Sequence, residues 1–116
     1  MILPKKRPKQ RMGVKEPSRE FPGHRAWVRR HQCSVVGCQH RLIEAAHYDG
    51  PVPYEDRGGM GLKDHDKWCF SLCVDHHAEY HRKGWRRFDR DHKLNTFEVA
   101  NQFAKNSPHR HRWEEV

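Results

Sequence analysis

The segment KDHDKWCFSLCVDHHAEYH, residues 63–81, constrains the fold more than any other part of the chain. Its apolar stretch predicts a short strand over 68–72, and the polar stretch that follows predicts a helix over 74–83. Gly84 stands just after that helix, where glycine commonly ends helices, and basic residues in the last turn suit the helix dipole. The expected centre of the domain is therefore a strand that turns directly into a helix.

Two histidines on this helix are spaced to share a metal ion. His77 and His81 are four residues apart, so both imidazoles would project from one face of the helix. A solvated helix face would explain either histidine alone, but it explains the pair poorly. The spacing therefore predicts a metal site with two imidazole ligands.

Cysteines predict a second metal site at the start of the same helix. Cys73 and His76 flank the strand-to-helix turn three residues apart, which suits one half of a zinc site. The turn-like segment CSVVGC would supply the other half through Cys33 and Cys38. Cys69 lies inside the predicted strand and is expected to be a buried apolar thiol, although a Cys₄ site with Cys69 in place of His76 is an alternative.

The composition favours a small metal-stabilised domain with an anionic partner. Only 34% of the 116 residues are hydrophobic and the mean hydropathy is −1.16, so a modest core needs another source of stability, such as a structural metal. The net charge of +8 favours a polyanionic partner. No apolar run is long enough to span a membrane, and no signal peptide is visible in MILPKKRPKQ. We therefore expect a reducing, cytoplasmic location in which cysteines bind metal rather than form disulfides.

Residues 1–20 are expected to form a disordered basic arm. They contain seven Lys or Arg against two Glu, a net charge of +5, and three prolines interrupt them. Such an arm would bind phosphates, with Lys5, Lys6 and Arg7 as candidates, or would only keep the protein soluble. The composition fits both interpretations.

Residues 21–31 predict a short helix that packs Trp27 onto the domain. Arg25, Arg29 and Arg30 would then face solvent or phosphate. Because no second aromatic residue accompanies Trp27, a core position is favoured over a platform on which nucleic-acid bases stack.

The remaining segments complete an α+β domain over residues 21–108. LIEAAH predicts a strand over 42–47 that ends at His47, and a loop over 48–62 follows, long enough to be functional. Two strands and the helix after them make a ββα unit.

The C-terminal part is expected to cover this unit. Trp85 and Phe88 would pack on the back of the metal-binding helix. Asn95 and Glu98 form a capping-box pattern, and the apolar residues after them predict a second amphipathic helix that ends before Pro108. Residues 109–116 are expected to be a frayed tail, with a His-rich metal tract as the less favoured alternative.

At this point the chain resembles the HNH (His-Me finger) endonucleases, and most closely their compact phage and prophage branch. The resemblance spans about residues 21–108 and is carried by a cysteine pair, an AAH strand, a glycine-rich loop, an LC-x2-HH helix and a G-x3-F continuation. It implies a zinc-stabilised ββα-metal domain that hydrolyses DNA phosphodiester bonds, either as a nickase or as a double-strand cutter. The zinc ligands would be Cys33, Cys38, Cys73 and His76.

The resemblance also implies catalytic roles. His47 matches the general base, since a neutral imidazole can take a proton from water at neutral pH. Asp66 matches the residue that orients this base, and Lys63 would contact the scissile phosphate or be a solvated loop lysine. His77 and His81 match the ligands of a catalytic Mg²⁺ or Mn²⁺.

One departure from the family concerns the catalytic metal. Many relatives have a third metal ligand just before the general base, and this chain has Ala46 there. The ion would then be held by the histidine pair with Asp66 as a candidate third ligand, or a partner or the substrate would complete the site.

The expected function is thus a metal-dependent DNA endonuclease in a bacterial cytoplasm, encoded by the host or by a phage. The alternative is a zinc-stabilised DNA-binding module without catalysis, in which the histidines are structural. A zinc-ribbon adaptor between proteins is disfavoured by the basic charge.

Overall fold

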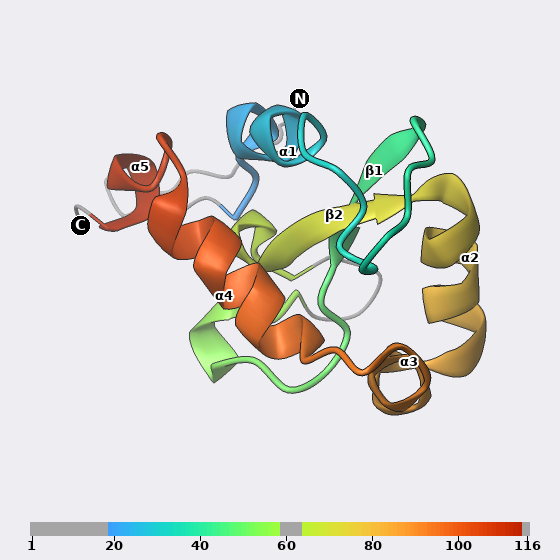
Figure 1. The fold of residues 1–116 in the computed structure, drawn as a ribbon. Coiled ribbons are helices and arrows are strands. Elements are labelled where there is room, and N and C mark those ends of the chain that lie inside the picture. Colours follow the sequence, from blue (N-terminus) through green and yellow to red (C-terminus); the bar gives the residue numbers. More distant parts are fainter. Residues whose placement is uncertain (1–18, 59–63, 115–116) are drawn as a thin grey trace, which may run out of the picture.

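The computed structural model describes residues 19–58 and 64–114 of the chain. The expected basic arm up to residue 18 and the candidate Lys63 lie outside these ranges. The elements follow in the order α1 (Pro22–Val28), β1 (Ile43–His47), η1 (Tyr54–Asp56), η2 (Asp66–Trp68), β2 (Cys69–Cys73), α2 (Val74–Lys83), α3 (Trp85–His92), α4 (Thr96–Asn106) and α5 (His111–Glu114), where η marks a 3₁₀ turn (Figure 1). The chain is a small α+β domain, as expected.

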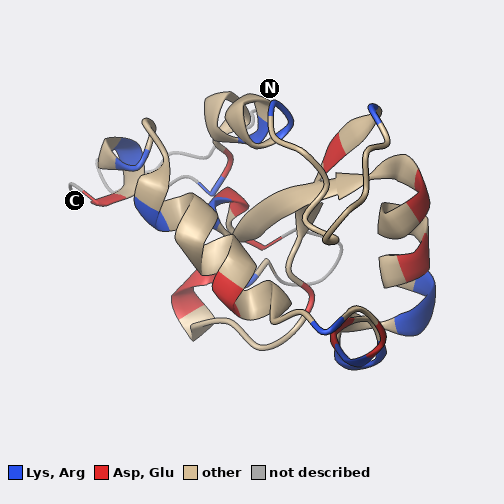
Figure 2. Ribbon diagram, viewed as in Figure 1, with Lys and Arg blue, Asp and Glu red and all other residues tan. Residues whose placement is uncertain are grey.

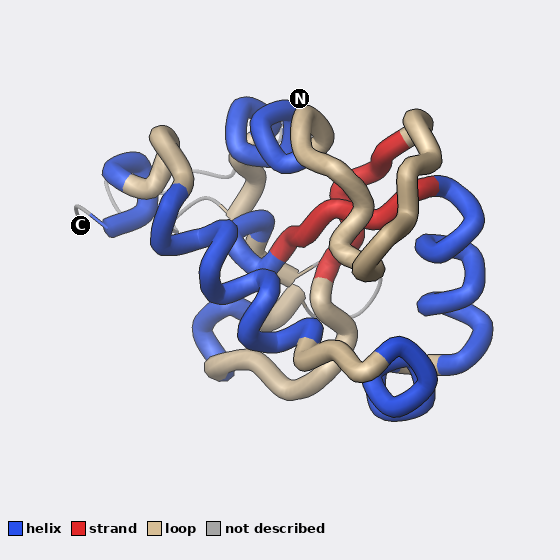
Figure 3. Tube along the Cα trace, viewed as in Figure 1, coloured by secondary structure: helices blue, strands red, loops and turns tan. Residues whose placement is uncertain are grey.

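The sheet has two antiparallel strands whose register brings His47 opposite Cys69 and Ile43 opposite Cys73. Every residue of β2 is buried, whereas β1 alternates between partly buried and exposed positions before Ala46. The predicted strand began one residue early, because Trp68 belongs to η2, where its N–H donates to the carbonyl of His65 at 3.1 Å. The two strands and α2 form the expected succession (Figure 3).

Helix α2 has the predicted bounds, and both of its ends have identifiable causes. Cys73 is the N-cap, and its sulfur accepts a hydrogen bond from the backbone N–H of His76. Gly84 ends the helix with φ of 85°, a left-handed conformation that glycine adopts without steric cost, and donates to the carbonyl of Tyr80. The same glycine precedes α3, which the sequence analysis did not predict as a helix.

The core lies between β2, α2, α3 and α4. Phe70, Leu72, Tyr80, Phe88 and Ala100 are fully buried in it. The ring of Phe88 packs edge-on against Tyr80 with centroids 5.2 Å apart, so α3 covers α2 as expected. Helix α4 crosses over β2 (Figure 1).

Helix α4 starts at the predicted cap. The side-chain oxygen of Asn95 accepts from the N–H of Glu98 at 3.1 Å, and the helix ends at Asn106, before Pro108. The segment after it differs from the frayed tail that the sequence predicted. Trp113 of α5 packs edge-on against Phe21 and His24, with centroids 5.2 and 5.0 Å away, so aromatic packing fixes residues that local sequence leaves unspecified.

No helix in the described ranges is long and apolar enough to cross a membrane. Lys and Arg lie mainly at the ends of helices and on loops, while Asp and Glu concentrate on α2, β1 and the η turns (Figure 2). Helix α2 carries Asp75 and Glu79 against Arg82 and Lys83, so it does not share the positive net charge of the whole chain.

His24 is fully buried and bonds through Nδ1 to the hydroxyl of Ser107 at 2.9 Å, whereas its Nε2 has no hydrogen-bond partner among the residues that the structure describes. Burial is the main cause that lowers the pKa of His24 to about 4, against the opposing charge of Asp66. As the pH falls from 6.5 toward 4, the unfolded chain binds a proton here that the folded chain does not bind.

We therefore predict that the free energy of unfolding falls by up to about 3 kcal/mol across this pH range because of His24. His24→Asn keeps a group that can bond Ser107 but cannot titrate. Denaturant unfolding of both proteins at several pH values should show a smaller loss in the variant. Parallel stability curves for the two proteins would contradict the prediction.

Candidate functional site

A cluster of three cysteines and one histidine lies where β2 meets α2. The ligand atoms of Cys33, Cys38, Cys73 and His76 all lie within 4.8 Å of one another. Nδ1 of His76 is 3.4 Å from the Cys33 sulfur and 3.3 Å from the Cys73 sulfur, and the Cys38 and Cys73 sulfurs are 3.9 Å apart. A tetrahedron with metal–sulfur bonds of ~2.3 Å has sulfurs about 3.8 Å apart. The four residues can therefore hold one metal ion.

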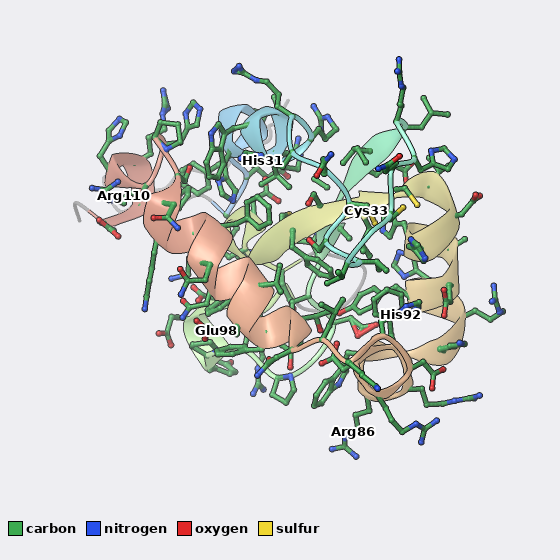
Figure 4. The ribbon with its side chains drawn as sticks, viewed as in Figure 1. His31, Cys33, Arg86, His92, Glu98 and Arg110 are labelled. Carbon is green, nitrogen blue, oxygen red and sulfur yellow. The ribbon has the colours of Figure 1, made fainter. Side chains whose placement is uncertain are left out.

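Local backbone geometry brings the first two cysteines to the helix. The turn between them closes through Gly37, which has φ of 83°, and the N–H of Cys38 donates to the carbonyl of Val35. The N–H of Ser34 bonds the carbonyl of Ser71 at 2.9 Å, which fastens this turn to β2 (Figure 4 labels Cys33).

The thiols of the cluster differ in their pKa values. Burial raises the pKa of Cys33 to about 11, while a backbone hydrogen bond at His40 lowers the pKa of Cys38. A bound cation would favour the thiolate form at both positions. Cys69, the alternative fourth ligand, is not part of this cluster, because it lies at the opposite end of β2 beside His47 and Asp66.

The second group of candidate functional side chains surrounds the carboxylate of Asp66, which is only 2% exposed. One oxygen of Asp66 lies 2.8 Å from Nε2 of His47. The other accepts from the N–H of Phe21 at 2.6 Å and from the guanidinium of Arg25. The predicted pairing of Asp66 with His47 is present in the structure.

These contacts fix the charge of Asp66 and the orientation of His47. Burial acts to raise the pKa of Asp66, but the hydrogen bonds from His47 and Phe21 and the charge of Arg25 outweigh it and hold the pKa below its usual range. An ionised carboxylate accepts the Nε2–H, so the neutral imidazole carries its lone pair on Nδ1. Nδ1 has no hydrogen-bond partner among the described residues and can accept a proton.

His77 and His81 lie together on α2, as their spacing predicts. Their ring centroids are 4.6 Å apart with a tilt of 33°, and Nδ1 of His77 lies 2.6 Å from a carboxylate oxygen of Glu44 on β1. Asp66 does not join them as a third ligand, because both of its oxygens are bonded elsewhere. Within the described ranges, no cluster of three close metal-binding groups includes this pair.

Two residues were not predicted to lie at the site. Arg25 of α1 was expected to face solvent or phosphate, but its guanidinium reaches Asp66 instead. Nothing in the local sequence distinguishes it from Arg29 and Arg30, which follow the helix. Asp49 follows the general-base candidate by two residues, and its backbone N–H donates to the hydroxyl oxygen of Tyr80 at 2.9 Å. Burial raises the pKa of Asp49, and the nearby charge of His81 opposes this effect. The sequence signal that could have identified Asp49 is an acidic residue just after the strand that ends in AAH.

The candidate phosphate-binding residues are only partly described. Arg29 and Arg30 are exposed at the C-terminal end of α1, as expected. Lys5, Lys6, Arg7 and Lys63 lie outside the described ranges, so their roles stay predictions.

Asp66→Asn should destabilise the fold and not only a reaction. An amide replaces one acceptor oxygen with a donor, which leaves Arg25, the Phe21 N–H or His47 unpaired. We expect a loss of about 2–4 kcal/mol, between that of one charged hydrogen bond and that of a buried ion pair. Asp75→Asn is the matched control, since the Asp75 side chain is 81% exposed. Equal unfolding free energies for the two variants would contradict the structural role of Asp66.

The site thus combines a buried carboxylate–imidazole pair, a histidine pair on α2 and a cluster able to hold a metal ion. Together these groups can accept a proton and bind cations on one ββα unit. No family model, curated protein or solved structure matches the chain, so any assignment of function depends on this geometry.

Proposed function

We propose that the chain is a metal-dependent endonuclease of the HNH type that hydrolyses phosphodiester bonds of DNA. The observation that carries this proposal is the hydrogen bond between His47 and the ionised, buried Asp66. It places a proton-accepting Nδ1 at the end of β1, and the charge of His81 acts on Asp49 just beyond that strand. The candidate base and the histidine pair therefore both adjoin β1, since His47 ends this strand and His77 bonds Glu44 of the same strand.

In this proposal the protein performs three tasks. Nδ1 of His47 takes the proton from a water molecule that attacks phosphorus, and Asp66 stabilises the imidazolium that results. His77 and His81 would hold a Mg²⁺ or Mn²⁺ ion, with Asp49 as a nearby carboxylate. Such an ion supplies charge stabilisation for the phosphoryl oxygens and the leaving group. Basic residues such as Arg29 and Arg30 would contact the DNA backbone.

We further propose that the four-residue cluster binds a structural Zn²⁺. Thiolates and imidazole are the ligands that zinc prefers, and four protein ligands leave no open position for chemistry. The ion would join the turn around Gly37 to the start of α2 and so fix the helix that carries the histidine pair.

The second candidate function is a zinc-stabilised DNA-binding module without catalysis. One observation favours it: His77 is bonded to Glu44 and no third ligand accompanies the histidine pair in the described ranges. A pure binding module, however, has no use for an oriented base with a free nitrogen. Cleavage experiments distinguish the two candidates.

Purified protein should contain one tightly bound zinc per chain, and Cys38→Ser should remove most of it. Because binding free energy at such a site contributes to folding, the variant should also melt at a clearly lower temperature. Elemental analysis and thermal unfolding provide the two readouts. Cys69→Ala is the control and should retain zinc, since Cys69 lies outside the cluster. A zinc-free parent protein with a normal melting curve would refute the zinc site.

His47→Ala should lower the rate of DNA cleavage by about 10²–10⁴-fold, as expected for a lost acid–base group, while DNA affinity stays near that of the parent. Supercoiled and single-stranded DNA with Mg²⁺ or Mn²⁺ serve as substrates. His81→Ala should also lose activity, but added Mn²⁺ should restore part of it, because that variant weakens ion binding only.

His111→Ala provides the matched control for this experiment, because His111 is an exposed histidine of α5 that takes no part in the site. It should cleave at the parent rate. Undiminished cleavage by a folded His47→Ala protein would remove His47 from the mechanism, and absence of cleavage by the parent protein would favour the binding module.

A further inference from the structure

Three aromatic rings form a cluster that the proposed nuclease site does not use: Trp27 of α1, His31 just after α1, and Phe103 of α4. The centroids of Trp27 and Phe103 are 5.7 Å apart, those of His31 and Phe103 are 5.0 Å apart, and those of Trp27 and His31 are 4.7 Å apart. All three side chains are only partly buried. The sequence analysis placed Trp27 in the core because it lacked an aromatic companion, and the structure supplies two.

These rings line a groove of about 360 Å³ between the two helices. We call it the α1–α4 groove; it is lined by Trp27, His31, Glu98, Val99, Gln102, Phe103 and Asn106. Its volume falls within the ~300–1,000 Å³ range of pockets that bind small organic groups. Figure 4 labels His31 and Glu98 on the two sides of this region.

The two sides of the groove differ in chemistry. Aromatic faces dominate near α1, whereas α4 contributes a carboxylate and two amides. The Gln102 amide donates to Glu98 at 2.7 Å, and the Asn106 amide donates to the carbonyl of Gln102 at 2.9 Å. The side-chain oxygens of Gln102 and Asn106 make no hydrogen bond to another described residue. An apolar floor with a polar edge suits a planar heteroaromatic ring better than an aliphatic side chain.

Positive charge lies directly beside the groove. Arg29 and Arg30 precede His31 and are exposed, and neither forms an ion pair with another residue of the described ranges. Lys105 is exposed on α4, next to Asn106. Planar stacking surfaces next to unpaired cations are the combination with which proteins bind single-stranded nucleic acids.

We propose that the α1–α4 groove stacks an unpaired base of a single-stranded nucleic acid while Arg29 and Arg30 bind the adjacent phosphates. In a duplex the faces of the bases are covered by their neighbours, so an unpaired base is needed here. Because the rings of Trp27 and Phe103 stand at 82° to each other, such a base would stack on one of them and meet the other edge-on. This inference rests on the proposed function and narrows its substrate to DNA that is single-stranded near the cut. Arg25, on the same short helix, bonds Asp66, so α1 connects the groove to the proposed site.

The test measures binding rather than cleavage. A fluorescein-labelled oligodeoxythymidine of about 12 nucleotides, within the ~4–16-nucleotide size of single-strand sites, is titrated with the zinc-containing full chain without Mg²⁺ or Mn²⁺. Fluorescence anisotropy reports affinity. Phe103→Leu and Trp27→Leu keep apolar volume but remove the stacking face, and each should weaken binding about 5- to 150-fold. For a duplex of the same length, each substitution should weaken binding by less than threefold.

Tyr54→Ala is the matched control, because Tyr54 is 82% exposed and has the guanidinium of Arg57 5.8 Å from its ring centroid, but lies outside the groove. It should bind like the parent. Melting curves identify any variant that fails to fold, and Phe103→Leu, with the smaller change in volume, keeps the test decisive if Trp27→Leu unfolds. Oligouridine in a parallel titration distinguishes RNA from DNA as the source of the base.

Parent-like affinity of a folded Phe103→Leu protein would overturn the inference. So would sedimentation showing that the parent self-associates and that Phe103→Leu does not, because a second copy of the chain would then cover the groove. Failure of the proposed function looks different: the parent would not cleave DNA, yet the groove variants would still lose affinity for the single strand.

Discussion

The arrangement of the proposed site depends on the buried carboxylate of Asp66. Its two oxygens join three parts of the chain: the end of β1 through His47, the entry to α1 through the Phe21 N–H, and the last turn of α1 through Arg25. Burying a carboxylate is costly unless hydrogen bonds and an opposite charge compensate for it, and here they do. The same contacts that make this burial favourable also select the tautomer of His47. Folding therefore also fixes the tautomer of His47, the proposed base.

Local sequence patterns predicted the elements whose ends have a chemical cause. Asn95 capped α4 and Gly84 ended α2 where expected, because a side-chain oxygen and a positive φ act within a few residues. The spacing of possible metal ligands likewise predicted that Cys33, Cys38, Cys73 and His76 would lie together, as they do. The apolar segment LIEAAH predicted the strand that ends at His47. The pairing of His47 with Asp66 was expected from a resemblance to a family, and the structure contains this hydrogen bond.

The features that were missed depend on contacts between distant residues. Arg25 reaches Asp66 across 41 positions of sequence, and no local pattern marks it among several basic neighbours. Trp113 packs on Phe21 although the C-terminal segment has no amphipathic period. Trp27 gains Phe103 as a neighbour only after α1 and α4 meet. Asp66 was expected to be available to a cation, and its complete set of partners became visible only in three dimensions.

Cys73 ends β2, caps α2 and belongs to the cluster whose other cysteines lie far upstream; its sulfur meets that of Cys38 across 35 positions. An ion held there would act as a cross-link that closes a loop containing β1. Closing such a loop removes conformational freedom from the denatured chain, so the ion would bias the chain toward the fold before α3 and α4 have packed. If the ion binds before the helices pack, the supply of metal would determine how fast the domain folds as well as how stable it is.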